Sequence, residues 1–237
     1  MVYRQLTEEE YADLQDRILY EDNHLLIADK RPGEIVQGDK SGDEPLSEKY
    51  KAFIAARDSK PGQVFMGVPH RLDRPVGGIV VFAKTSKALE RLSGMFREGR
   101  MHKTYWALVC KEPVPCCGEL THYLTRNEKS NKSFVSNPGA RDAKEARLAY
   151  RLLQATDRYW LVEVELFTGR HHQIRCQLAA IGCPIKGDLK YGAPRSNPDG
   201  SISLMARNIR FVHPVKGTEI EINAPVPSSW KGVHPES

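Results

Sequence analysis

Residues 70–83 read His-Arg-Leu-Asp-Arg-Pro-Val-Gly-Gly-Ile-Val-Val-Phe-Ala, which sets one acid among bases directly ahead of an apolar run. A β-branched and aromatic run that follows a glycine pair predicts a buried strand entered through a tight turn. We therefore expect Asp73 at the mouth of a central strand. Two interpretations of this carboxylate are open. It forms a structural ion pair with Arg71 or Arg74, or it is an ionised nucleophile or base whose charge those cations favour.

A second stretch, residues 168–175, reads Thr-Gly-Arg-His-His-Gln-Ile-Arg and is equally rich in groups that bind anions. Its glycine should turn a strand into a helix that ends near Gly182, which is suited to a C-cap. We expect His171 and Arg175 to lie one turn apart on a flank of that helix. Together the two stretches favour a catalytic acid that faces a phosphate-rich partner.

The pattern of both stretches resembles the RluA-type RNA pseudouridine synthases, which carry His-Arg-Leu-Asp before an apolar strand and Thr-Gly-Arg-x-His-Gln-Ile-Arg later in the chain. The resemblance covers about residues 17–230 and is to a member without the small N-terminal RNA-binding domain that the family often carries. The chain departs from the family at 76–78, where Val-Gly-Gly replaces the usual Thr-Ser-Gly. Further matches are Tyr20-Glu-Asp22, Lys30-x-Pro-Gly33, Lys103-Thr-Tyr105, Pro184-Ile-x-Gly-Asp188, Tyr191-Gly192 and Phe211-Val-His-Pro214.

The resemblance implies an α+β fold, with a largely antiparallel sheet flanked by helices and a central RNA-binding cleft. It implies that Asp73 is the catalytic residue, either as a nucleophile on the ribose or as a base that takes a sugar proton. It also implies that Arg175 keeps that carboxylate charged in the pocket. Tyr105 would lie against the uracil and help to move the proton at carbon 5.

Three further residues are implied in substrate binding. Arg71 resembles the arginine that fills the gap left when the uridine is flipped out of its stack. His70 and Gln173 lie beside the two catalytic positions in the motifs. Because flipping costs least where pairing is already absent, we expect a looped or single-stranded site in rRNA or tRNA.

Two other functions stay open. One is a catalytically silent RNA-binding or assembly factor of the same fold. The other is an Asp-dependent nucleoside hydrolase, which would release free uracil. The chain has no phosphate-loop or dinucleotide motif, and His171, His172, Cys176 and Cys183 are a poor match for a zinc site, so we expect neither cofactor nor metal.

We expect an RNA-binding enzyme that is cytoplasmic, soluble and monomeric. The net charge of +5 is uneven: residues 1–30 hold 8 acidic and 3 basic residues, so residues 31–237 carry +10. A basic body favours a polyanionic partner. No apolar run is long enough to cross a membrane, and the five cysteines, odd in number and without CxxC spacing, predict reduced thiols.

We expect an acidic helical extension at 1–16, one catalytic domain at 17–230 and a tail at 231–237. Residues 112–147 should form a basic, turn-rich excursion with short strands. Helices are predicted over 7–15, 46–57, 86–98 and 169–181. Strands are predicted over 17–20, 24–28, 64–68, 79–83, 103–109, 147–155, 159–167, 202–212 and 218–222.

Overall fold

The computed structural model describes residues 3–59 and 62–234, and the chain divides into two compact units. The first unit comprises residues 1–101 and 208–225, and the second comprises 102–207 and 226–237. The sequence did not predict this division. The first two residues of the expected extension and the last three of the expected tail lie outside the described residues.

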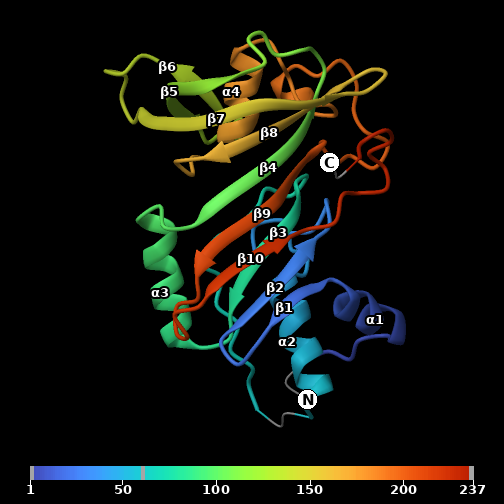
Figure 1. The fold of residues 1–237 in the computed structure, drawn as a ribbon. Helices are drawn as coiled ribbons and strands as arrows, with labels where there is room; N and C mark the ends of the chain where they lie inside the picture. The colour runs from blue at the N-terminus through green and yellow to red at the C-terminus, as the bar shows by residue number, and fades with distance from the viewer. Residues whose placement is uncertain (1–2, 60–61, 235–237) are drawn as a thin grey trace. The chain divides into compact units, whose positions relative to one another are not determined.

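The first unit is a sheet covered by helices (Figure 1). Its strands follow the order β1-β2-β3-β9, with β10 beside β9, and the pairings with known register are antiparallel. The helices are α1 (Glu8–Asp16), α2 (Leu46–Arg57) and α3 (Ser86–Arg97). The strands are β1 (Ile18–Glu21), β2 (Leu25–Lys30), β3 (Gly77–Ala83), β10 (Glu219–Asn223) and the end of β9 (Leu204–Val212).

Strand β3 is the centre of this unit, because all seven of its residues are buried. The ring of Tyr50 on α2 lies 5.9 Å from that of Phe82 on β3. Two helix starts follow local rules. Thr7 and Glu10 form the predicted capping box of α1, and Thr85 caps α3 by accepting from the Ala88 amide.

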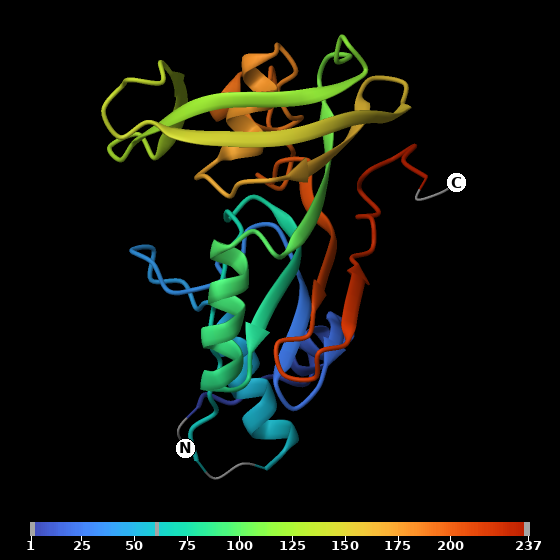
Figure 2. The same ribbon diagram turned by 60° about the vertical axis from the view of Figure 1, so that its left-hand side comes forward.

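The second unit contains a sheet of order β4-β8-β7-β5-β6, with antiparallel pairings. Helix α4 packs on β5 and β6, and Figure 2 shows β5 and β7 as two long neighbouring strands. The elements are β4 (His102–Val109), β5 (Cys117–Asn127), β6 (Lys132–Ser136), β7 (Lys144–Ala155), β8 (Trp160–Leu166), α4 (Gln173–Ala180) and the 3₁₀ turn η1 (Leu189–Tyr191).

Three expected elements differ in the structure. Residues 64–68 form only a single bridge, Gly67 to Ala83, and the backbone of Val64 bonds to the hydroxyl of Tyr3. Residues 112–147 contain long strands, which the sequence hid because one face of β5 and β7 is polar and charged. Helix α4 begins at Gln173, so His171 precedes it, and His172 adopts a left-handed φ of 53°.

The expected fold class is confirmed as α+β with antiparallel sheets and flanking helices. All five cysteines are free thiols, as predicted. None of the helices in the described ranges is long and apolar enough to span a membrane.

Candidate active site

The loop that carries Asp73 is tied to the ammonium group of Lys30. This lysine is 1% exposed, and its Nζ donates to the carbonyl oxygens of Val76 at 2.7 Å, Arg74 at 3.1 Å and Asp73 at 3.4 Å. Burial lowers the pKa of Lys30 to about 8, against the attraction of Glu34 and Asp73. The group therefore remains largely charged at neutral pH, and it organises the main chain around the half-buried Asp73.

The rest of the Lys30-x-Pro-Gly33 motif supports the same loop. The Gly33 amide donates to the Arg74 carbonyl at 2.7 Å. A Cβ on Gly77 would lie 3.2 Å from Cδ of Pro32, and Gly78 has a φ of 99°. The glycine pair therefore allows a close approach and then a left-handed turn into β3.

The histidine and arginines beside Asp73 have different surroundings. His70 stacks on Phe96 at 4.3 Å and accepts the Val81 amide on Nε2, which places its ring hydrogen on Nδ1. Arg71 is exposed. Arg74 turns towards the 41–43 loop, where it pairs with Asp43, so the structural ion pair of this arginine is made with another acid.

Tyr105 and Lys103 project from the same face of β4, because they are two residues apart on a strand. Tyr105 is 9% exposed and pairs with Val164 of β8. Burial lowers the pKa of Lys103. The second unit therefore holds a nearly buried phenol beside a lysine that carries its charge less readily than usual.

Arg175 makes a buried ion pair with Asp188. Its Nε and Nη2 donate to the two carboxylate oxygens at 2.7 and 2.8 Å, and the two side chains are 6% and 1% exposed. The guanidinium also lies 5.1 Å from the ring centroid of Tyr191. This two-point contact fixes the plane of the guanidinium. The prediction that Arg175 supports the charge of Asp73 is not tested by these contacts.

Tyr191 connects the Arg175 segment to strand β6. Its hydroxyl accepts the Ser133 amide at 2.8 Å and lies 3.0 Å from Nδ1 of His172. Burial raises the pKa of Tyr191 to about 12, so the hydroxyl keeps its proton. Ser133 in turn donates to the His171 carbonyl at 2.6 Å. The loop before α4 is therefore tied to the sheet by side chains.

Gln173 fastens the same loop from the other side. Its amide oxygen accepts from the Thr168 hydroxyl at 2.8 Å and the Arg170 amide at 2.9 Å, and its nitrogen donates to the Arg147 carbonyl at 3.0 Å. These contacts, with an exposed fraction of 3%, make Gln173 a positioning residue for residues 168–172. Its role in binding substrate, like that of His70, stays a prediction.

The sequence did not predict the positioning roles of Lys30, Asp188 and Tyr191. All three belong to motifs that matched the family, but nothing in their local sequence says which distant group each one holds. In the ranges 3–59 and 62–234, no group of three or more His, Cys, Asp or Glu side chains is placed to hold a metal ion.

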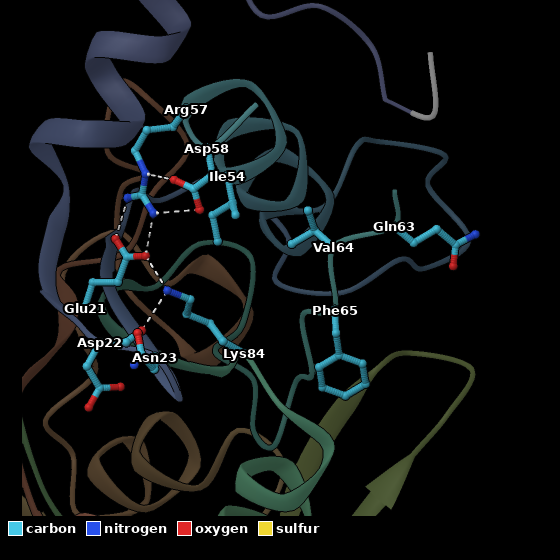
Figure 3. A pocket seen from close by; sticks show the side chains of 10 residues that line it. All are labelled: Glu21, Asp22, Asn23, Ile54, Arg57, Asp58, Gln63, Val64, Phe65 and Lys84. Atoms are coloured by element: carbon cyan, nitrogen blue, oxygen red, sulfur yellow. Dashed lines mark hydrogen bonds and ion pairs between the residues drawn. The ribbon is translucent and has the colours of Figure 1, made fainter. Parts of the chain in front are cut away.

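A pocket of about 440 Å³ lies in the first unit (Figure 3). Arg57 pairs with Glu21 at 2.6 Å and with Asp58 at 2.8 Å, and Lys84 pairs with Glu21 at 2.6 Å. None of the six predicted site residues lines it. Its cations are neutralised within the pocket, so its charge does not favour an RNA phosphate. The lining residues are Glu21, Asp22, Asn23, Ile54, Arg57, Asp58, Gln63, Val64, Phe65 and Lys84.

Comparison with known proteins assigns the family. A family model described as RNA pseudouridylate synthase matches residues 24–180. Over 221 residues the chain is 36% identical to ribosomal large subunit pseudouridine synthase C of Vibrio vulnificus, which covers 91% of this chain and 67% of that protein. The chain belongs to the RNA pseudouridylate synthase family. It is thus an RNA pseudouridine synthase, an isomerase.

Other relatives of this pseudouridine synthase agree. The chain is 30% identical to ribosomal large subunit pseudouridine synthase D of Xanthomonas campestris, over 91% of this chain and 67% of that one. The solved structure of human RNA pseudouridylate synthase domain containing 4 has a TM-score of 0.77 at 23% identity, over 92% of both chains. This second likeness shows that the two chains share a fold.

Proposed function

We propose that this pseudouridine synthase isomerises particular uridines of rRNA or tRNA, with Asp73 as the catalytic residue and with the target base flipped out of its stack. The observation that carries the proposal is the hold of Lys30 on the loop 73–76. Three main-chain carbonyls of that loop are bonded to one buried ammonium, which also attracts the Asp73 carboxylate electrostatically. A fixed main chain restricts the positions that the Asp73 carboxylate can reach, which lowers the entropy cost of the reaction.

Tyr105 and Arg175 complete the proposed machinery. Tyr105, nearly buried on β4, offers a ring that can stack on uracil and a hydroxyl that can pass a proton. Arg175, whose guanidinium plane is fixed by Asp188, is the cation that would keep the Asp73 carboxylate charged. Arg71, exposed beside Asp73, is the candidate for the place vacated by the flipped base.

Ribosomal RNA is the first substrate to test, because the Vibrio and Xanthomonas relatives are named for the large ribosomal subunit. The two catalytic routes, nucleophile or base, both require the ionised Asp73. The proposed reaction breaks the bond from uracil N1 to the ribose C1′ and forms one from C5 to C1′, and the C5 proton is exchanged for one on N1. It is balanced without an oxidant, a reductant or a nucleotide.

The test compares wild type with Asp73→Asn on rRNA and tRNA from cells that lack the protein. The substitution keeps shape and removes charge, so pseudouridine formation should fall below a few per cent while RNA binding persists. Asp39→Asn, an exposed carboxylate of the same unit, is the matched control and should retain full activity. Equal activity of Asp73→Asn and wild type would remove Asp73 from the mechanism.

The same reactions separate the rival functions. A nucleoside hydrolase would release free uracil, whereas an isomerase releases none. A silent RNA-binding factor would bind both RNAs and give no pseudouridine at any position. Repeating the wild-type reaction in EDTA tests the expectation that no metal takes part, provided that the RNA is shown to stay folded.

A further inference from the structure

Three cations gather at the tip of the β5–β6 hairpin, outside the groups placed in the reaction above. Arg126 lies near the end of β5, Lys132 begins β6, and Lys190 lies on η1. Asn131 links two of them: Nη2 of Arg126 donates to its side-chain oxygen at 3.1 Å, and Nζ of Lys190 donates to its carbonyl at 3.1 Å. We call Arg126, Lys132 and Lys190 the hairpin cation cluster.

The partners of the cluster are neutral. Lys190 also donates to the Ser130 carbonyl at 3.2 Å, and Nζ of Lys132 lies 5.0 Å from the ring centroid of Tyr191. Across residues 3–59 and 62–234, none of the three cations forms an ion pair with a carboxylate. Glu128 in the turn is adjacent to Lys129, and the nearby Asp188 is taken by Arg175. Together with Glu128 and Lys129 of the turn, the cluster therefore carries a net positive charge of +3.

The turn that carries the cluster has a defined shape. Asn131 has a left-handed φ of 45°, a conformation that asparagine tolerates better than most residues. Its amide donates to the Glu128 carbonyl, and the Ser130 amide donates to Oδ1 of Asn127 at 3.1 Å. Cations held by such a turn lose less conformational entropy on binding than cations on a flexible tail.

The buried histidine beneath the cluster reflects this charge. Burial, followed by the influence of Arg175, His171, Lys190 and Arg126, lowers the pKa of His172 to about 2. Its ring is therefore neutral at physiological pH. A neutral ring suits its contact with the Tyr191 hydroxyl, which connects the cluster to the Arg175 segment.

An exposed aromatic ring adjoins the cluster. Phe134 on β6 is 43% exposed, and Nζ of Lys132 lies 5.3 Å from its centroid. A phosphate-binding cation beside an open ring is the combination that binds single-stranded nucleic acid, where the backbone meets the charge and a base stacks on the ring. An acidic peptide would use the charge and leave the ring without a stacking partner.

We propose that the hairpin cation cluster binds the phosphodiester backbone of the RNA strand that flanks the target uridine, with Phe134 stacking on one of its bases. The proposal rests on the proposed function and adds the surface by which this chain holds its substrate outside the reacting nucleotide. Figure 1 shows the hairpin at the β5–β6 edge of the second unit, next to α4.

The first experiment measures the affinity for a fluorescein-labelled 16-nucleotide oligouridylate against KCl concentration. The triple variant Arg126→Ala, Lys132→Ala, Lys190→Ala should reduce the slope of log K against log salt by about 2, since each lost contact to a single strand removes about 0.7. The matched control Lys111→Ala, Arg158→Ala, Lys231→Ala removes the same charge from exposed sites of the same unit. Equal slopes for the two triple variants would overturn the proposal.

A second pair of variants tests the turn without removing a cation. Asn131→Asp places a carboxylate between Arg126 and Lys190 and should weaken oligouridylate binding about tenfold at 50 mM KCl. Asn131→Gly keeps the left-handed backbone and should stay within about threefold of wild type. Wild-type affinity in Asn131→Asp would show that RNA does not contact the cluster.

Two further measurements distinguish RNA from other polyanions and separate a failure of this proposal from a failure of the proposed function. Phe134→Ala should lower the affinity for oligouridylate about fivefold or more and leave the affinity for polyglutamate, measured by displacement, unchanged. Equal losses of affinity for the two polymers would favour a general polyanion site and overturn the RNA assignment. On rRNA, the cation triple variant should raise KM and spare kcat. If Asp73→Asn is inactive but the cation triple variant keeps the wild-type KM, this surface proposal fails and the catalytic one stands.

Discussion

In the first unit, the loop of Asp73 is fastened through its main chain, by a buried ammonium that meets three of its carbonyl oxygens. In the second unit, Arg175 is fastened through its own guanidinium, by a buried carboxylate and an aromatic ring. The first arrangement orients a residue through its main chain. The second uses part of the functional group to hold the rest in place.

The two arrangements respond differently to substitution. The ammonium group of Lys30 is buried and donates to main-chain carbonyl oxygens. Burying this charge is costly, and the cost depends on pH because the group loses its proton near pH 8. Arg175 is buried with an acid, so its charge is compensated. Removing either partner should strongly destabilise the fold. Four substitutions separate these cases.

Asp188→Ala should have the largest effect, because it leaves the Arg175 guanidinium buried and uncompensated. We expect a loss of about 3–5 kcal/mol in the free energy of unfolding. Urea denaturation of wild type and variant measures it. Asp199→Ala, a carboxylate of the same unit that lies largely at the surface, is the control and should lose far less. A loss for Asp188→Ala below about 1 kcal/mol would indicate a solvated pair.

Lys30→Met should destabilise the first unit by about 2 kcal/mol at pH 7, because buried carbonyls lose a charged donor. Between pH 8 and 10.5 the unfolded chain still binds the Lys30 proton that the folded protein has released. Wild-type stability must therefore rise with pH in that window relative to Lys30→Met, by up to about 3 kcal/mol. Urea titrations of both proteins at pH 7, 8, 9 and 10 test this, and parallel curves would contradict it.

Tyr191→Phe tests the hydroxyl that ties the Arg175 segment to β6. The ring stays over Arg175, but the Ser133 amide and His172 lose the hydroxyl. We expect a loss of about 1–2 kcal/mol, the cost of leaving a buried donor unsatisfied. Tyr159→Phe, whose hydroxyl has no such contact to Ser133, is the control. No difference between the two variants would show that the hydroxyl does not tie the Arg175 segment to β6.

Gly78→Ala should cost about 1 kcal/mol, since alanine is strained at a φ of 99°. Gly94→Ala in α3 meets only ordinary contacts and should stabilise the protein by up to about 1 kcal/mol. Opposite shifts of the thermal midpoint are the expected result. The same sign for both would mean that the turn into β3 relaxes to accept a side chain.

Much of the local structure could be predicted from residues that are close together in the chain. The apolar run at 79–83 gave β3, with Asp73 just ahead of it, because a run of this kind signals a buried strand within a few residues. Thr7 with Glu10 and Thr85 mark helix starts for the same local reason. The motifs around Asp73 and Arg175 indicated the family, and the comparisons confirmed it.

The groups that hold these motifs in place come from distant parts of the chain and could not be predicted in this way. Lys30 reaches a loop more than 40 residues away, and Tyr191 joins Ser133 across 58 residues. The long pairing of β5 with β7 and the division into two units were equally hidden. Local propensity is read from neighbours in the chain, whereas a buried lysine or arginine takes whichever acceptor the folded chain brings to it, because leaving its charge unpartnered in the interior costs several kcal/mol.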